Sequence, residues 1–139
     1  MNIKNHLEQI GRLDKRIQNK LEEIDKLRRM ASGTSYSESE RVQTSLSADK
    51  IGAIASRIVD MEKEVDRLID ERCLIVAEIE SMKNEDDYDV LASIYILGKD
   101  IKTVAVEMGK SYRHVSDLHK KALNDFEEMH KKKLLPKIS

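Results

Sequence analysis

Apolar residues recur every three or four positions over two long stretches of this sequence, which strongly restricts what the chain can fold into. The first series runs from Ile3 to Leu27, and the second runs from Ile51 to Met82 with only Arg72 interrupting it. Such spacing places apolar side chains along one side of an α-helix, while charged residues cover the rest of its surface. The sequence therefore predicts helices over 3–30 and 49–83, the second with the heptad rhythm of a coiled coil.

Composition favours an all-α fold. Charged residues make up 37% of the 139 residues and aromatic residues only 4%, with five Gly and one Pro. Sheets draw on aromatic residues and on Gly and Pro turns, so this composition argues against a β-rich fold. We expect residues 1–83 to form a long antiparallel coiled-coil hairpin, in which a Ser/Thr-rich loop at 31–47 connects the two helices.

The long helices also predict self-association. Their apolar stripes are too long to be buried in a compact domain, so we expect an edge that includes Leu13 and Leu27 to pack against a second copy. Two-fold pairing is the common way to close such a surface, which favours a homodimer and leaves a tetramer open. Arg72 either fixes the register of the seam or lies at its edge. The seam residues assigned to oligomerisation are Ile10, Ile17, Ile24, Ile58, Met61, Val65, Leu68 and Ile75.

Residues 84–139 have a different organisation, with short helices predicted over 88–97 and 101–108 and a longer one from Tyr112. Asp100 and Ser111 suit the position before a helix, where a side-chain oxygen accepts from free backbone N–H groups. Gly109 permits the positive φ needed directly after a helix. A helix, a short turn with Gly and a second capped helix are typical of a helix-turn-helix within a three-helix module.

The run from Asp100 to Leu123 resembles the promoter-binding region four of bacterial sigma factors. The residues that carry this resemblance are Ala105, Met108-Gly109, Ser111, Val115, Leu118 and Ala122-Leu123. Together with the coiled coil and the Ser-rich loop, they make the whole chain similar to small sigma-like regulators of Gram-positive phages and prophages.

The resemblance implies that the helix from Tyr112 is a recognition helix, which enters the major groove of DNA. Arg113 suits guanine and Lys120 suits phosphate, whereas Lys99 and Lys102 lie where they could contact the flanking backbone. The DNA-binding residues that follow from this placement are Lys110, Ser111, Tyr112, Arg113, His114, Ser116, Asp117, His119, Lys120 and Lys121.

We therefore expect a sequence-specific DNA-binding transcriptional regulator of the phage or prophage type, acting in the cytoplasm of the bacterial host. Its expected partners are double-stranded DNA, a second copy of itself and RNA polymerase. Two alternatives stay open: a protein-interaction factor whose coiled coil and sigma-like module contact RNA polymerase or a repressor, and a DNA-packaging recognition subunit. Residues 110–137 hold eight Lys or Arg against four Asp or Glu, a local charge of +4. This basic tail either lies along phosphates or is simply solvated.

No enzyme activity, cofactor, metal site or membrane contact is expected. The four His are scattered along the chain at positions 6, 114, 119 and 130, and no Gly-rich phosphate loop occurs. Cys73 has no second cysteine to pair with, which suits a reducing cytosol, and we expect it to act as a small apolar filler. The first residues lack the apolar core of a signal peptide, and no apolar run approaches the roughly 20 residues that span a bilayer.

Overall fold

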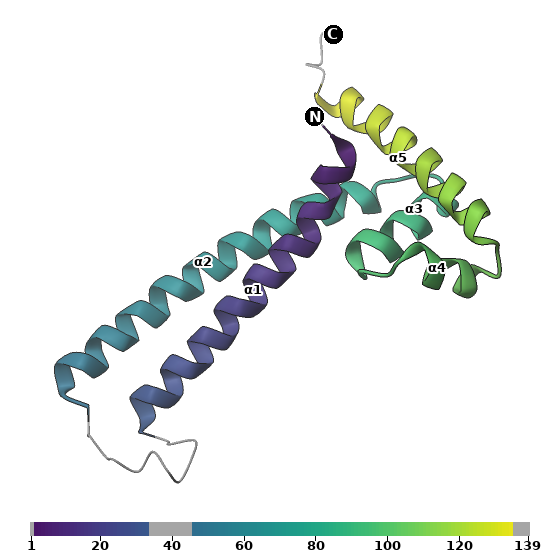
Figure 1. The fold of residues 1–139 in the computed structure, drawn as a ribbon. Coiled ribbons are helices and arrows are strands. Elements are labelled where there is room, and N and C mark those ends of the chain that lie inside the picture. Colours follow the sequence, from purple (N-terminus) through teal and green to yellow (C-terminus); the bar gives the residue numbers. More distant parts are fainter. Residues whose placement is uncertain (1, 34–45, 135–139) are drawn as a thin grey trace. The chain divides into compact units, whose positions relative to one another are not determined.

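The computed structural model describes residues 2–33 and 46–134, and every regular element in these ranges is helical (Figure 1). The predicted all-α class is therefore confirmed. Most of the 31–47 loop, and the end of the basic tail from 135, lie outside the described residues. The elements are α1 (Ile3–Ser32), α2 (Ala48–Glu80), α3 (Glu85–Leu91), the π-helical turn η2 (Ala92–Ile96), α4 (Ile101–Met108) and α5 (Tyr112–Leu134).

The chain divides into two compact units, each described by itself below. One unit is Leu13–Asp70, and the other combines Met1–Arg12 with Glu71–Ser139. The first turns of α1 and the last turns of α2 therefore belong to the same unit as α3, α4 and α5.

Within Leu13–Asp70, the facing sides of α1 and α2 form an apolar core. Its buried members are Ile24 and Leu27 from α1 and Ile58, Met61 and Val65 from α2, all at most 9% exposed. These are the positions that the three-and-four spacing placed on one side of each helix. Because burying a side chain of this kind is worth about 1.5–3 kcal/mol, this core is the main source of stability for the pair.

Two ion pairs at the rim of this core show the direction of the helices. Lys20 pairs with Glu64 at 2.6 Å and Arg28 pairs with Glu62 at 2.7 Å, so a higher number on α1 meets a lower number on α2. This is the order of an antiparallel pair. The hydrogen bond from Lys20 holds the pKa of Glu64 below its ordinary value. These pairs are partly exposed and add little beside the buried side chains.

The burial of the seam corrects the expectation that its edge is left uncovered by the chain itself. Leu13 and Leu27, expected at a free edge, are buried within the single chain, and Ile17 is partly buried against its core. Leu13 and Leu27 therefore do not form an exposed edge, and pairing of two copies stays a prediction. The other residues assigned to oligomerisation are also buried: Ile10, Ile24, Ile58, Met61, Val65, Leu68 and Ile75.

Local side-chain and backbone hydrogen bonds set the ends of α4 and the start of α5. Asp100 Oδ1 accepts from the backbone N–H of Thr103 at 2.8 Å, and Ser111 Oγ accepts from that of His114 at 3.0 Å. Both are the N-caps expected from the sequence. Between them Gly109 has the left-handed φ of 66°, and the N–H of Lys110 turns back to the carbonyl of Ala105 at 3.0 Å. The corner between α4 and α5 therefore takes only residues 109–111.

An apolar cluster fixes α4 against α5. Val104 and Ala105 of α4 and Val115 of α5 are its buried members, with exposed fractions of 5% or less. The partly buried side chains of Ile94 and Met108 pack around them. The small side chain of Ala105 allows the two helices to approach closely where they meet, as the sequence indicated.

Replacing Gly109 tests whether the left-handed corner is needed. A Cβ at Gly109 meets no atom within 4 Å, so Gly109→Ala changes only the backbone preference. We expect it to lower the free energy of unfolding by about 1–2 kcal/mol, because an L-residue is strained at positive φ. Gly11→Ala is the matched control, since Gly11 lies within α1 with equally open space and should gain up to about 1 kcal/mol. Equal effects of the two substitutions in urea unfolding would contradict this account.

Candidate nucleic-acid interface

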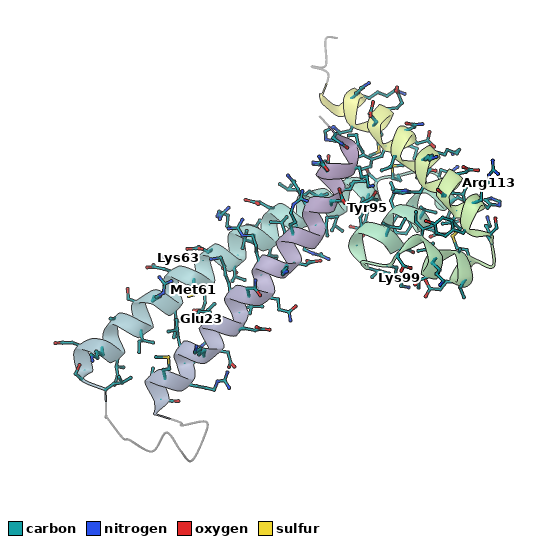
Figure 2. The ribbon with its side chains drawn as sticks, viewed as in Figure 1. Glu23, Met61, Lys63, Tyr95, Lys99 and Arg113 are labelled. Carbon is teal, nitrogen blue, oxygen red and sulfur yellow. The ribbon has the colours of Figure 1, made fainter. Side chains whose placement is uncertain are left out.

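The first turns of α5 present a polar face to solvent. Tyr112 is 60% exposed, and Arg113, His114, Asp117 and Lys120 are also exposed. Figure 2 shows Arg113 directed away from the neighbouring helices. The opposite side of the same turns is occupied by buried Val115. This face therefore offers a guanidinium, an imidazole, a carboxylate and an ammonium group within three helical turns.

Several of these groups have no partner among the residues that the structure describes. In the described residues, no ion pair or side-chain hydrogen bond involves Arg113, Lys120 or the His114 ring. A hollow on this surface is lined by Ser111, Arg113, His114, Asp117, Leu118 and Lys121. Unpaired donors around a hollow can bind a polar ligand without first breaking contacts inside the protein.

Other predicted DNA-binding residues are only partly available. Lys110 and Ser116 are half-buried, and the Ser111 hydroxyl is used for the cap of α5. Of the flanking lysines, Lys99 is held by both carboxylate oxygens of Glu107 at 2.9 and 3.0 Å, whereas Lys102 is exposed.

His119 faces the protein, which differs from the outward position expected for it. The hydroxyl of Tyr95 lies 2.6 Å from Nε2 of His119, and the two rings are 5.6 Å apart. Burial lowers the pKa of His119 and raises that of Tyr95 to about 12. The lowered pKa favours the neutral imidazole, which can accept a hydrogen bond from the Tyr95 hydroxyl, and this contact ties η2 to α5.

Lys121 is also engaged by the chain itself. Its ammonium lies 2.8 Å from Oδ2 of Asp125 and 3.4 Å from Oδ1 of Asp87, a residue of α3 that is only 2% exposed. Desolvation, followed by the neighbouring carboxylate of Asp125, raises the pKa of Asp87, whereas that of Asp125 is lowered. Oδ2 of Asp87 is buried with no donor among the described residues. The raised pKa favours the protonated form of Asp87, and the Lys121 ammonium links this residue of α3 to α5.

A cluster of potential metal ligands was missed by sequence reasoning. His6, Glu78 and His130 come from α1, α2 and α5, and their ligand atoms all lie within 4.8 Å of one another. The sequence held a signal for this cluster. Each of its residues lies three or four positions from a buried apolar residue of its own helix, which places it on the inner side of that helix. His6 follows Ile3 and His130 follows Phe126 in this way.

Comparisons of the chain with protein-family models, curated proteins and solved structures gave no match. In the part of the chain that the structure describes, none of the helices combines the length and the apolar character needed to cross a membrane.

Removing the Tyr95 hydroxyl tests the tie between η2 and α5. Tyr95→Phe leaves Nε2 of the half-buried His119 without its partner, so we expect a loss of about 1–2 kcal/mol in unfolding free energy at pH 8. Tyr112→Phe removes an exposed hydroxyl and should stay within about 0.5 kcal/mol of the parent. A Tyr95→Phe protein as stable as this control in urea unfolding would refute the role of the hydrogen bond.

The raised pKa of Asp87 predicts how the free energy of unfolding depends on pH. Because its folded pKa is raised, its contribution to stability is fully present below the unfolded pKa and is lost as pH rises through the folded value. The lowered pKa of Asp125 acts in the opposite sense, its contribution being lost as pH falls. Asp87→Asn removes the titration of Asp87, while its amide can still donate a hydrogen bond toward Asp125, so its unfolding free energy should gain on that of the parent as pH rises from about 4 to 8. The exposed Asp89→Asn is the control, and a gain for Asp87→Asn that does not grow with pH would contradict a raised pKa of Asp87.

Proposed function

We propose that this chain is a sequence-specific DNA-binding transcriptional regulator of the phage or prophage type, in which α4, the corner 109–111 and α5 act as a helix-turn-helix. The observation that carries the proposal is that α5 begins directly after a tight corner, with Arg113 and Lys120 exposed and paired with no other described residue. A recognition helix needs this arrangement, because its N-terminal side chains must reach base edges in the major groove.

Each exposed side chain suits a particular contact. Arg113 has the planar donor pair that matches O6 and N7 of guanine, and Asp117 can accept from the amino group of cytosine. Lys120, about two turns further along α5, suits a phosphate oxygen. In this proposal His119 and Lys121 support α5 from within instead of contacting DNA, since Tyr95 and Asp125 already engage them.

Substitutions of charged residues on α5 test the proposal. A target duplex is first selected from random sequences at about physiological salt. Arg113→Glu should weaken binding of the selected duplex by about 10- to 100-fold and relax the preference at one position. Lys120→Ala should weaken binding of all sequences alike and reduce the slope of log K against log salt concentration by about one. Fluorescence anisotropy over a salt series measures both effects.

The matched control is Lys63→Glu, which makes the same kind of charge change at an exposed position of α2. It should bind the selected duplex like the parent, and circular dichroism should show equal helix content in every variant. If Arg113→Glu and Lys120→Ala also bind like the parent, the proposal is wrong.

Exposed apolar side chains favour the protein-interaction factor as a second candidate. Val106 of α4 is 77% exposed and Leu97, directly after η2, is 63% exposed. Removing such exposed aliphatic groups from water is favourable, so a partner such as RNA polymerase that covers them is bound more tightly. Intact DNA binding in Val106→Asp, together with lost transcriptional effect, would indicate that both activities belong to the same module.

A further inference from the structure

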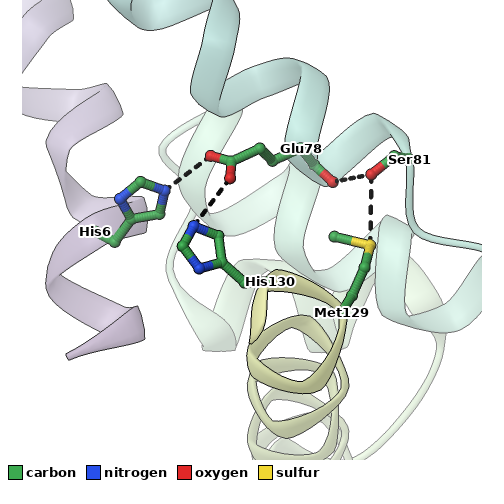
Figure 3. Close-up of polar contacts among 5 residues, drawn as sticks. All are labelled: His6, Glu78, Ser81, Met129 and His130. Carbon is green, nitrogen blue, oxygen red and sulfur yellow. Dashed lines mark hydrogen bonds and ion pairs between the residues drawn. The ribbon is translucent and has the colours of Figure 1, made fainter. Parts of the chain in front are cut away.

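The side chains of His6, Glu78 and His130 converge where the first turns of α1, the last turns of α2 and the last turns of α5 meet (Figure 3). All three residues belong to the unit that combines Met1–Arg12 with Glu71–Ser139. Nε2 of His6 lies 2.8 Å from Oε1 of Glu78, and Nε2 of His130 lies 3.1 Å from Oε2. Each imidazole therefore faces its own oxygen of one carboxylate.

From this arrangement we propose that His6, Glu78 and His130 form a binding site for a divalent transition-metal ion of the zinc class. Two histidines and one glutamate are a known protein ligand set for Zn²⁺, which leaves a fourth position for water or an external ligand. Imidazole nitrogen is a preferred donor for zinc and its neighbours in the first transition row.

The distances require only small side-chain movements on metal binding. At Zn–N and Zn–O lengths of about 2.0–2.2 Å, two ligand atoms of a tetrahedral site lie about 3.3–3.5 Å apart. One oxygen of Glu78 would serve as the ligand, so its distance of 2.8 or 3.1 Å to the nearer imidazole nitrogen would lengthen by a few tenths of an ångström. The ligand atoms all lie within 4.8 Å of one another, so the second nitrogen also starts close to its place. Rotations about side-chain bonds supply such shifts without moving a helix.

The charge at the cluster favours a cation. Among the described residues, no Lys or Arg side chain pairs with Glu78, whose carboxylate faces the two imidazoles. With both rings in the neutral form that binds metal, the cluster carries one negative charge, and a divalent ion converts this to one positive charge. No fixed cation has to be displaced first.

The surroundings hold the ligands in place and leave a route for the ion. Phe126, fully buried, stacks on the ring of His130 at a centroid distance of 5.8 Å and lies 6.2 Å from that of His6. The side chains of the cluster are 10% to 23% exposed, which shelters them from bulk water without sealing them off. The Ser81 hydroxyl donates to the backbone carbonyl of Glu78 at 2.7 Å and steadies the end of α2.

Bound metal would connect three helices that the sequence separates widely. Because the ion binds the folded arrangement and not the dispersed ligands of the unfolded chain, it stabilises the fold by mass action. This site lies at the opposite end of α5 from Arg113, so the inference does not depend on whether the exposed face binds DNA.

The test is zinc titration of the full chain, without a histidine tag and with Cys73→Ser to remove the exposed thiol. After treatment with a chelator, Zn²⁺ alone should bind one ion per chain in calorimetry. At a free zinc concentration about 100 times Kd, Tm should rise by on the order of 5–10 °C. Co²⁺ in place of Zn²⁺ should give the visible absorption bands of a tetrahedral site.

The variants His6→Gln and His130→Gln should each weaken zinc binding by at least about tenfold, which at the same free zinc concentration removes about half of the rise in Tm or more. The matched control is His114→Gln, which removes an exposed imidazole and should leave zinc affinity unchanged. If His130→Gln does not fold by circular dichroism, His6→Gln decides the question, because His6 is the more exposed of the two imidazoles. The proposal is wrong if zinc does not bind stoichiometrically, or if His6→Gln and His114→Gln lose equal amounts of zinc affinity. The cluster would then be a set of hydrogen bonds between helices that holds no metal.

Discussion

The unit formed by Met1–Arg12 and Glu71–Ser139 depends on the packing of the inner side of α5 against the other helices. Val115 packs against Val104 and Ala105 of α4, and further along the same side Phe126 is fully buried. His130, one turn after Phe126, reaches Glu78 of α2. Because one helix carries all these contacts, packing its inner side also fixes which side chains of its first turns face solvent.

The corner between α4 and α5 depends on a different kind of constraint, which is local. A left-handed glycine ends α4, and a serine hydroxyl begins α5 two residues later. With so few residues in the turn, α5 cannot start elsewhere without losing either its cap or the contact between Ala105 and Val115. The exposure of Arg113 follows from this fixed start and not from any interaction of its own.

Buried polar groups add directional contacts to a fold held together by apolar packing. A buried polar group without a partner costs free energy, so each such group must find its partner in one arrangement of the helices. Tyr95 meets His119, and Asp87 meets Lys121, which together dock η2 and α3 on α5. Titratable residues of α5 thus differ in role: Arg113 and Lys120 on the outer face pair with no other described residue, whereas His119 and Lys121 hold neighbouring helices.

The sequence by itself determined the helical class, the approximate limits of the helices, and the caps at Asp100, Gly109 and Ser111. These features depend on residues three or four positions apart, so local spacing and side-chain chemistry are sufficient to predict them. The apolar seam showed which side of each long helix is buried and predicted a hairpin, but it did not show how far the hairpin alone covers that side, because a heptad pattern is the same for a partner helix in the same chain and in a second copy. Only the tertiary structure decided that Leu13 and Leu27 are covered within the chain, that His119 turns to Tyr95, and that His6 and His130 meet at Glu78. Contacts of this kind join residues far apart in the sequence, and they form only after several helices have packed at particular angles, which no local pattern specifies.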